Sequence, residues 1–395
     1  MMESRRGGNL ARALPSPDLG RPVLATPFIW VAPESIPPRK WLFGRHAIRQ
    51  FLSATIAAGG AGKTSNALAE AVAFVTGRDI LKDHLITSGR SWYIGLEDPL
   101  EEYQRRVAAI VLHHGLTPTE VAAGLFLDSG RDQDFIIGRE GRSGIIIADP
   151  LVESIVQCIR TNNIAHVTID PFVACHAVRE NDNSAIDAVA RVWADIADRT
   201  GAAIELVHHV RKLAPGQEIT ADDARGASAM VGKARSVRLV TGMTKEEAEQ
   251  AGADDRRRFF RLVNGKANLA LQSEKPIWRQ LVSVSLGNGQ GDPDDYVQAA
   301  APWTWPDAFA GLTSTDLQRV QDRIAAGEYR ANPQAKDWAG YAVAEVLRLD
   351  IATKAGKHKV KLLLDTWVRI GALRQEKRPD SSRQERPFIV VGNRT

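Results

Sequence analysis

The sequence predicts an α/β fold with a mostly parallel sheet, followed by a smaller domain built mainly of helices. Two observations predict the first part. A glycine-rich loop stands between a strand-like run and a helical run, and apolar strands then alternate with amphipathic helices as far as residue 209. Such alternation requires right-handed crossovers and places the strands in one parallel sheet. Three helical segments and two short strands after residue 313 predict the second part.

The glycine-rich loop covers residues 57–64, with the sequence Ala-Ala-Gly-Gly-Ala-Gly-Lys-Thr. It follows the strand-like run 53–56 and precedes the alanine-rich run 65–75, which is the context that a phosphate-binding loop requires. Glycines let backbone N–H groups curl around an anion, and the start of the helix adds its own unpaired N–H groups. The structural alternative is a turn that ends in Lys-Thr by chance. We predict a phosphate site made by Gly59, Gly60, Ala61, Gly62, Lys63, Thr64 and Ser65.

Within this loop, two side chains have the chemistry that phosphoryl transfer needs. Lys63 can reach the β- and γ-phosphates of a nucleotide, and Thr64 can offer its hydroxyl to Mg²⁺. The sequence therefore predicts ATP and Mg²⁺ as the ligands of this site.

Two of the following strands end in acids. The apolar strand 91–96 runs into Glu97, and the strand that begins at residue 165 ends in Asp170. In open α/β sheets, the carboxyl ends of strands beside the phosphate loop lie where the terminal phosphate binds. We predict that Glu97 activates the attacking water and that Asp170 is a second anchor for Mg²⁺. The alternatives are a helix N-cap acid for Glu97 or its neighbour Asp98, and a turn residue for Asp170.

A histidine pair ends the strand 203–207. Because parallel strands end at one edge of their sheet, His209 should meet Lys63, Glu97 and Asp170 there. A histidine at this edge can donate to the γ-phosphate or relay its loss on hydrolysis. The structural alternative is a turn histidine whose hydrogen bonds are satisfied locally, and it is stronger for His208 than for His209.

The composition is that of an ordinary soluble protein. The chain has 395 residues, of which 44% are hydrophobic and 25% charged, and its net charge of +4 does not by itself indicate a nucleic-acid partner. Cys158 and Cys175 form no C-x-x-C pair, so we expect core residues in a reducing compartment. No apolar run approaches the roughly 20 residues of a membrane helix, and no signal peptide is recognisable, so we expect a cytoplasmic protein without a membrane partner.

The chain divides into four predicted regions. The aromatic segment 36–43 is expected to pack on the core of its own subunit, with a latch onto a neighbouring subunit as the alternative. Residues 259–268 are expected to form a hairpin. The regions are a loose N-terminal extension (1–35), the ATPase domain (36–286), a linker rich in Gly, Asp and Pro (287–312) and a C-terminal domain (313–395).

The C-terminal domain has the order of a winged helix-turn-helix. Helical patterns at 314–326, 337–349 and 357–370 precede two strand-like runs, 372–374 and 387–391. A basic surface of this kind suits contact with duplex DNA, and docking to another protein is the alternative. The basic side chains here are Lys354, Lys357, Lys359, Lys361, Arg374, Lys377, Arg378, Arg383 and Arg386.

Taken together, the motifs between residues 50 and 275 resemble the plasmid RepA-type hexameric DNA helicases. Alanine rather than glycine at the first loop position, Ala57, suits the RecA-like branch of P-loop ATPases. The motifs that carry the resemblance are the loop 59–64, Glu97-Asp98-Pro99, Asp170, His208-His209, Arg225-Gly226-Ala227-Ser228, Arg235, 243–249, 256–260 and 266–268.

The resemblance implies a RecA-like ATPase whose six-membered ring moves on single-stranded DNA. It implies the roles given above for Lys63, Thr64, Glu97 and Asp170, and it makes His209 the sensor of the γ-phosphate. It also implies that Arg235 is an arginine finger that enters the neighbouring subunit's site, where a guanidinium stabilises charge on the phosphoryl oxygens. The alternative for Arg235 is a surface or inter-helix ion pair, and Arg238 is the chief rival for the finger.

Three functions remain open at the level of sequence. The leading prediction is a homo-oligomeric, ring-forming helicase or translocase that acts in DNA replication. The second is a DNA-bound ATP switch, in which ATP sets only the state of assembly. The third is an accessory ATPase that loads another replication protein.

Overall fold

The computed structural model describes residues 24–142, 144–210, 228–271, 275–379 and 384–393. Residues Met1–Arg39 form one compact unit and Lys40–Thr395 a second. The described part of the first unit holds a short 3-10 helix, η1 (Pro33–Ser35). Residues 1–23 of the predicted N-terminal extension lie outside the described residues.

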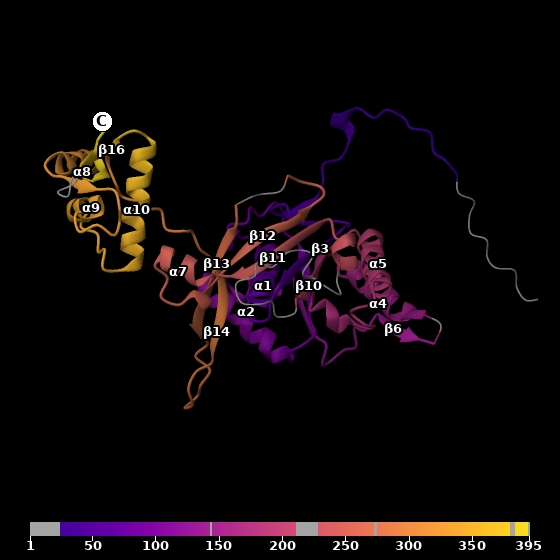
Figure 1. Ribbon diagram of the computed structural model, residues 1–395. Helices are drawn as coiled ribbons and strands as arrows, with labels where there is room; N and C mark the ends of the chain where they lie inside the picture. Colours follow the sequence, from indigo (N-terminus) through magenta and orange to yellow (C-terminus); the bar gives the residue numbers. More distant parts are fainter. Residues whose placement is uncertain (1–23, 143, 211–227, 272–274, 380–383, 394–395) are drawn as a thin grey trace, which may run out of the picture. The chain divides into compact units, whose positions relative to one another are not determined.

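A nine-stranded sheet forms the centre of the second unit (Figure 1). The six neighbouring strands from β11 to β5 are parallel, and β12, β13 and β14 add an antiparallel extension. This arrangement confirms the predicted α/β fold with a RecA-like core. In spatial order the strands are β14 (Tyr296–Pro302), β13 (Ile277–Ser285), β12 (Phe259–Ala267), β11 (Ser236–Gly242), β3 (Leu52–Ala57), β10 (Ala203–His209), β8 (Ile164–Asp170), β4 (Arg90–Gly95) and β5 (Leu125–Ser129).

Helices bury both faces of this sheet. The helices α4 (Asp149–Thr161), α5 (Asn183–Thr200) and α6 (Ser228–Lys233) pack on one face. The helices α1 (Lys63–Thr76), α2 (Leu100–His114) and α3 (Pro118–Ala122) pack on the other. Burial on both faces explains why the parallel strands are continuous apolar runs in the sequence.

The start of the second unit packs on the core of its own subunit. A short strand, β1 (Trp41–Phe43), pairs with β2 (Ala47–Ile48). Leu42 and Phe43 are buried against Phe74 of α1. The expected packing within the subunit is therefore confirmed for these residues.

A small sheet lies beside α5. It joins β6 (Gly138–Gly141), β7 (Gly144–Ile147) and β9 (His176–Ala177), and η2 (Phe172–Cys175) leads into it. The two cysteines are free: Cys175 is buried, and Cys158 is half-buried against the main core. Their expected place in the core is confirmed.

Two predictions about the chain after residue 259 are wrong. No turn interrupts 259–268, because β12 runs on to Ala267 and pairs with β11 along its length. The predicted linker 287–312 contains β14, which pairs with β13 as the edge strand of the sheet. The residues rich in Gly and Asp form the connection between β13 and β14, and the alanines at 299–301 are buried in the core.

Residues beyond 313 have a hydrophobic core of their own. A capping box between Thr313 and Asp316 begins the first helix. None of the helices in the described ranges is long and apolar enough to cross a membrane. The elements are α8 (Ser314–Ala325), β15 (Tyr329–Arg330), α9 (Ala339–Leu347), α10 (Lys354–Arg369), β16 (Leu373–Pro379) and β17 (Glu385–Val391), and the three strands form one sheet.

Candidate active site

The glycine-rich loop joins the central strand β3 to helix α1, whose first residue is Lys63. Gly62 precedes the helix with φ of 90°, a left-handed conformation that favours glycine. A Cβ atom at Gly62 would also lie 2.8 Å from the ring of Phe260 on β12. The loop therefore needs glycine here both for its backbone conformation and for its close approach to β12.

A cavity of about 280 Å³ opens above this loop. It brings together Lys63, Glu97 and His209, which the sequence analysis predicted to meet at this edge of the sheet. Their roles in catalysis stay predictions. The cavity is lined by Gly60, Gly62, Lys63, Thr64, Ser65, Glu97, Asp98, Arg106, His209 and Gln298.

Asp170 lies at the end of β8, within hydrogen-bond distance of the loop. The hydroxyl of Thr64 donates to its Oδ2 over 2.7 Å, and the hydroxyl of Tyr93 donates to the same oxygen over 2.7 Å. Burial and the neighbouring Asp170 carboxylate raise the pKa of Tyr93, so this phenol stays protonated as a donor. The carboxylate is thus held in place beside the first turn of α1.

Oxygen donors of this kind fit Mg²⁺, which prefers hydroxyl and carboxylate ligands together with substrate phosphates and water. Thr64 and Asp170 are the residues that would hold it. In the described residues there is no group of three or more His, Cys, Asp and Glu side chains able to bind a metal ion alone. The chemistry therefore fits a cation that arrives with a nucleotide.

Glu97 and His209 face each other across the cavity, with 3.5 Å between Glu97 Oε1 and His209 Nε2. The main chain of Glu97 is fixed, because its N–H donates to the Tyr103 hydroxyl and its carbonyl accepts from the Arg131 guanidinium. Its side chain is 55% exposed, so the carboxylate can reach water. Burial and the Lys63 ammonium lower the pKa of His209, which keeps the imidazole neutral at pH 7.

The neighbouring His208 points elsewhere. It is buried, its ring packs edge-on against Phe172, and it does not line the cavity. Burial lowers the pKa of His208 to about 4. This environment agrees with the structural alternative for His208 and with a site that uses His209.

Sequence reasoning missed three residues of the site. Arg106 lines the cavity and forms ion pairs with Asp98 at 3.0 Å and Glu102 at 2.9 Å. In the sequence, its spacing from Glu102 indicates only an ordinary helical ion pair. Gln298 lies on β14, inside the predicted linker, and Tyr93 lies within a buried strand, so no local pattern marks either of them.

Arg235 lies at the opposite edge of the sheet from the phosphate loop. It precedes β11, its N–H donates to the carbonyl of Leu52 over 2.8 Å, and its exposed guanidinium lies 5.9 Å from the ring of Phe51. The length of β3, Leu52–Ala57, separates it from the loop by roughly 16 Å at the usual rise of a strand. Arg235 therefore does not reach the cavity of its own subunit.

Arg238 is excluded as the rival finger. Its side chain is buried and forms a bidentate ion pair with Glu70 of α1, and it also donates to Thr55 over 3.0 Å. Because a finger must leave its own subunit, a guanidinium held in this way cannot serve as one. The loop 211–224 and residues 225–227 of the family motif lie outside the described residues.

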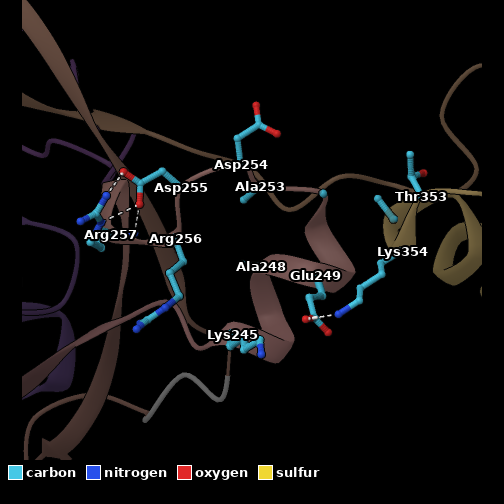
Figure 2. Close-up of a pocket in the computed structure, with 12 residues that line it drawn as sticks. Lys245, Ala248, Glu249, Ala253, Asp254, Asp255, Arg256, Arg257, Thr353 and Lys354 are labelled. Atoms are coloured by element: carbon cyan, nitrogen blue, oxygen red, sulfur yellow. Dashed lines mark hydrogen bonds and ion pairs between the residues drawn. The ribbon is translucent and has the colours of Figure 1, made fainter.

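A second cavity, of about 700 Å³, lies between α7 (Lys245–Ala251) and the start of α10 (Figure 2). Its walls mix both signs of charge. Figure 2 shows Asp255 paired with Arg257 at 2.9 Å, and Glu249 paired with Lys354. Since these two carboxylates are neutralised by cations, the cavity has no arrangement of groups suited to catalysis.

Comparisons with known proteins agree with this geometry. Residues 19–215 match the family described as AAA domain. Among solved structures, the fold is similar to the ATPase domain of a replicative helicase, with 11% identity and a TM-score of 0.42 over 59% of this chain and 82% of that one. It is also similar to the RadB recombinase, with 12% identity and a TM-score of 0.39 over 61% of this chain and 89% of that one.

The chain thus carries an AAA-type P-loop ATPase domain on a RecA-like core. Domains of this class bind a nucleotide, usually with Mg²⁺.

Proposed function

We propose that this protein is an ATP-hydrolysing, ring-forming DNA motor, a helicase or translocase that acts in replication. The observation that carries the proposal is the convergence of Lys63, Glu97 and His209 on one cavity, with the hydrogen-bonded pair Thr64–Asp170 beside it. These groups come from the carboxyl ends of β3, β4, β10 and β8, which is where open α/β sheets bind nucleotides.

In this proposal, Lys63 and the backbone N–H groups of the loop bind the β- and γ-phosphates. Glu97 accepts a proton from the water that attacks the γ-phosphate, since its fixed main chain aims an exposed carboxylate into the cavity. Neutral His209 donates a hydrogen bond to the γ-phosphate and loses that partner when phosphate leaves. Mg²⁺, when bound, would neutralise charge on the phosphate oxygens.

Arg235 completes the site of an adjoining subunit. Its place at the far edge of the sheet supports this assignment, because a side chain there can act only on another copy. A finger supplied between copies requires a closed ring, and we propose a hexamer.

The C-terminal domain is proposed to bind DNA. Its three helices and three-stranded sheet, in the order α8, β15, α9, α10, β16 and β17, support a winged helix. Lys357 and Lys361 on α10, and Arg374 and Lys377 on β16, are exposed and can contact phosphates of a duplex. Single-stranded DNA is proposed to pass through the ring.

The test is ATP turnover with and without single-stranded DNA, together with the mass of the assembly. A motor predicts turnover that single-stranded DNA stimulates, a ring-sized mass, and loss of turnover in Lys63→Ala. Slow hydrolysis that ignores DNA, with specific duplex binding, would instead support the ATP switch.

A mixing experiment tests the finger. Arg235→Ala and Lys63→Ala are each expected to be inactive alone. Mixed subunits should regain part of the activity, since some interfaces then pair an intact Lys63 with an intact Arg235. Mixed assemblies without activity would contradict the in-trans role of Arg235.

A further inference from the structure

A third cavity, of about 370 Å³, adjoins the phosphate cavity. The two share Ser65, Arg106 and Gln298, so one opens onto the other. The new cavity extends away from the loop between α2 and the edge strand β14, which lie side by side (Figure 1). Its lining residues are Ser65, Glu102, Arg105, Arg106, Asp295, Tyr296, Val297 and Gln298.

The strand β14 sets the direction of this cavity. Side chains two residues apart on a strand share a face and lie roughly 7 Å from each other. Gln298 borders both cavities, and Tyr296 lies one such step further from the phosphates. An ion pair of 3.1 Å between Arg105 of α2 and Asp295 holds helix and strand together at this point. A molecule anchored by its phosphates at the loop would extend toward Tyr296.

Tyr296 has no packing role that explains its place. Its side chain is 70% exposed, although it is a large aromatic residue on the edge strand of the main sheet. An aromatic ring beside a polar cavity offers a flat face on which a nucleobase can stack. Glu102 lines the same cavity and can accept hydrogen bonds from ribose hydroxyls.

We propose that this cavity holds the nucleoside of the bound nucleotide, with the base stacked on Tyr296 and the ribose beside Glu102. The proposal rests on the proposed binding of ATP at the glycine-rich loop, and it adds the residue that recognises the base. Asp295 and Tyr296 lie outside the segment 19–215 that matches the AAA domain, so their assignment comes from the structure.

Binding of two probes tests this site: ATP, and inorganic triphosphate, which has phosphates but no base. Tyr296→Ala should weaken ATP binding about tenfold, the effect of losing about 1.4 kcal/mol of stacking, and leave triphosphate binding unchanged. Tyr296→Phe keeps the ring and should bind ATP as the wild type does. Tyr341→Ala, at an exposed tyrosine of α9, is the matched control and should change neither.

Three results would overturn the proposal. They are unchanged ATP affinity in Tyr296→Ala, equal weakening of ATP and triphosphate, or a changed assembly mass without a change in affinity, which would make Tyr296 a contact between subunits. Failure of the underlying function looks different. In that case Lys63→Ala would bind both probes as well as the wild type does.

Discussion

The hydroxyl of Thr64 donates a hydrogen bond of 2.7 Å to Oδ2 of Asp170. The two residues are 106 positions apart, and they join the first turn of α1 to the end of β8. Tyr93 donates to the same carboxylate oxygen. Two neutral hydroxyls therefore hold one anionic group beside the loop that is proposed to bind phosphate.

Asp170→Asn should lower Mg²⁺-dependent ATP turnover by about 10- to 100-fold, the usual effect of losing a partner of a bound metal. The amide keeps the size of the side chain but lacks the charge that attracts a cation. Steady-state phosphate release measures the effect, and circular dichroism checks the fold. Asp128→Asn is the control, because this carboxylate, near the end of β5, does not line the cavity. Turnover within twofold of wild type in Asp170→Asn would count against the metal role.

Gly62→Ala should abolish nucleotide binding. An alanine would have to hold the left-handed conformation, which costs about 1–3 kcal/mol, and its Cβ would press on the ring of Phe260. Gly59→Ala is the control, since a Cβ there meets no atom within 4 Å. Calorimetric titration with ATP separates the two. Equal affinities in both variants would show that the loop does not depend on its conformation at Gly62.

Arg238→Met should lower the free energy of unfolding by about 3–5 kcal/mol, because it leaves buried carboxylates without their cation. Arg238 pairs with Glu70 and lies 3.8 Å from Glu205. Burial alone would raise the pKa of Glu205, but His46 and Arg238 outweigh burial and lower it to about 2. Urea unfolding measures the loss.

Arg235→Met provides the contrast for this experiment. Its guanidinium is exposed, so we expect little change in stability but a loss of turnover. If the two variants were equally stable, the buried network would not have the structural role described here.

Stability should fall as the pH drops from 6.5 toward 4, in part because of His166. This side chain is buried between β4 and α1, and burial lowers its pKa from 6.5 to about 4. Within that window the unfolded chain binds a proton that the folded chain does not. His166 therefore contributes a fall of about 1.4 kcal/mol per pH unit.

Urea midpoints at several pH values in this window measure the effect. His166→Gln should make stability fall less steeply with pH, and His113→Gln, at an exposed histidine of α2, should not. An unchanged slope in His166→Gln would contradict the effect of burial on His166.

Much of the ATPase core could be predicted from the sequence, because there burial and local pattern coincide. The helix predicted at 183–200 has those bounds in the structure, since Asp182 caps its start and Gly201 adopts a left-handed conformation at its end. The strand predicted at 144–147 is likewise observed. Such elements are specified by their own residues.

The antiparallel extension could not be predicted in the same way. The strand β14 begins Tyr-Val-Gln and continues with three alanines, so it lacks a strong strand pattern and forms by pairing with β13. The wall of the site that includes Gln298 and Tyr296 depends on this pairing. Lys63, Glu97, Asp170 and His209, in contrast, stand next to recognisable motifs at the ends of strands.

The most direct test of the central claim is ATP turnover by Glu97→Gln, measured together with its affinity for ATP. If Glu97 activates the attacking water, turnover should fall by about 10²–10⁴-fold while ATP still binds as it does to the wild type. Glu101→Gln, at an exposed carboxylate on the first turn of α2, should keep full turnover. Turnover of Glu97→Gln at the wild-type rate would contradict the claim that ATP is hydrolysed in this cavity by the groups assigned to it.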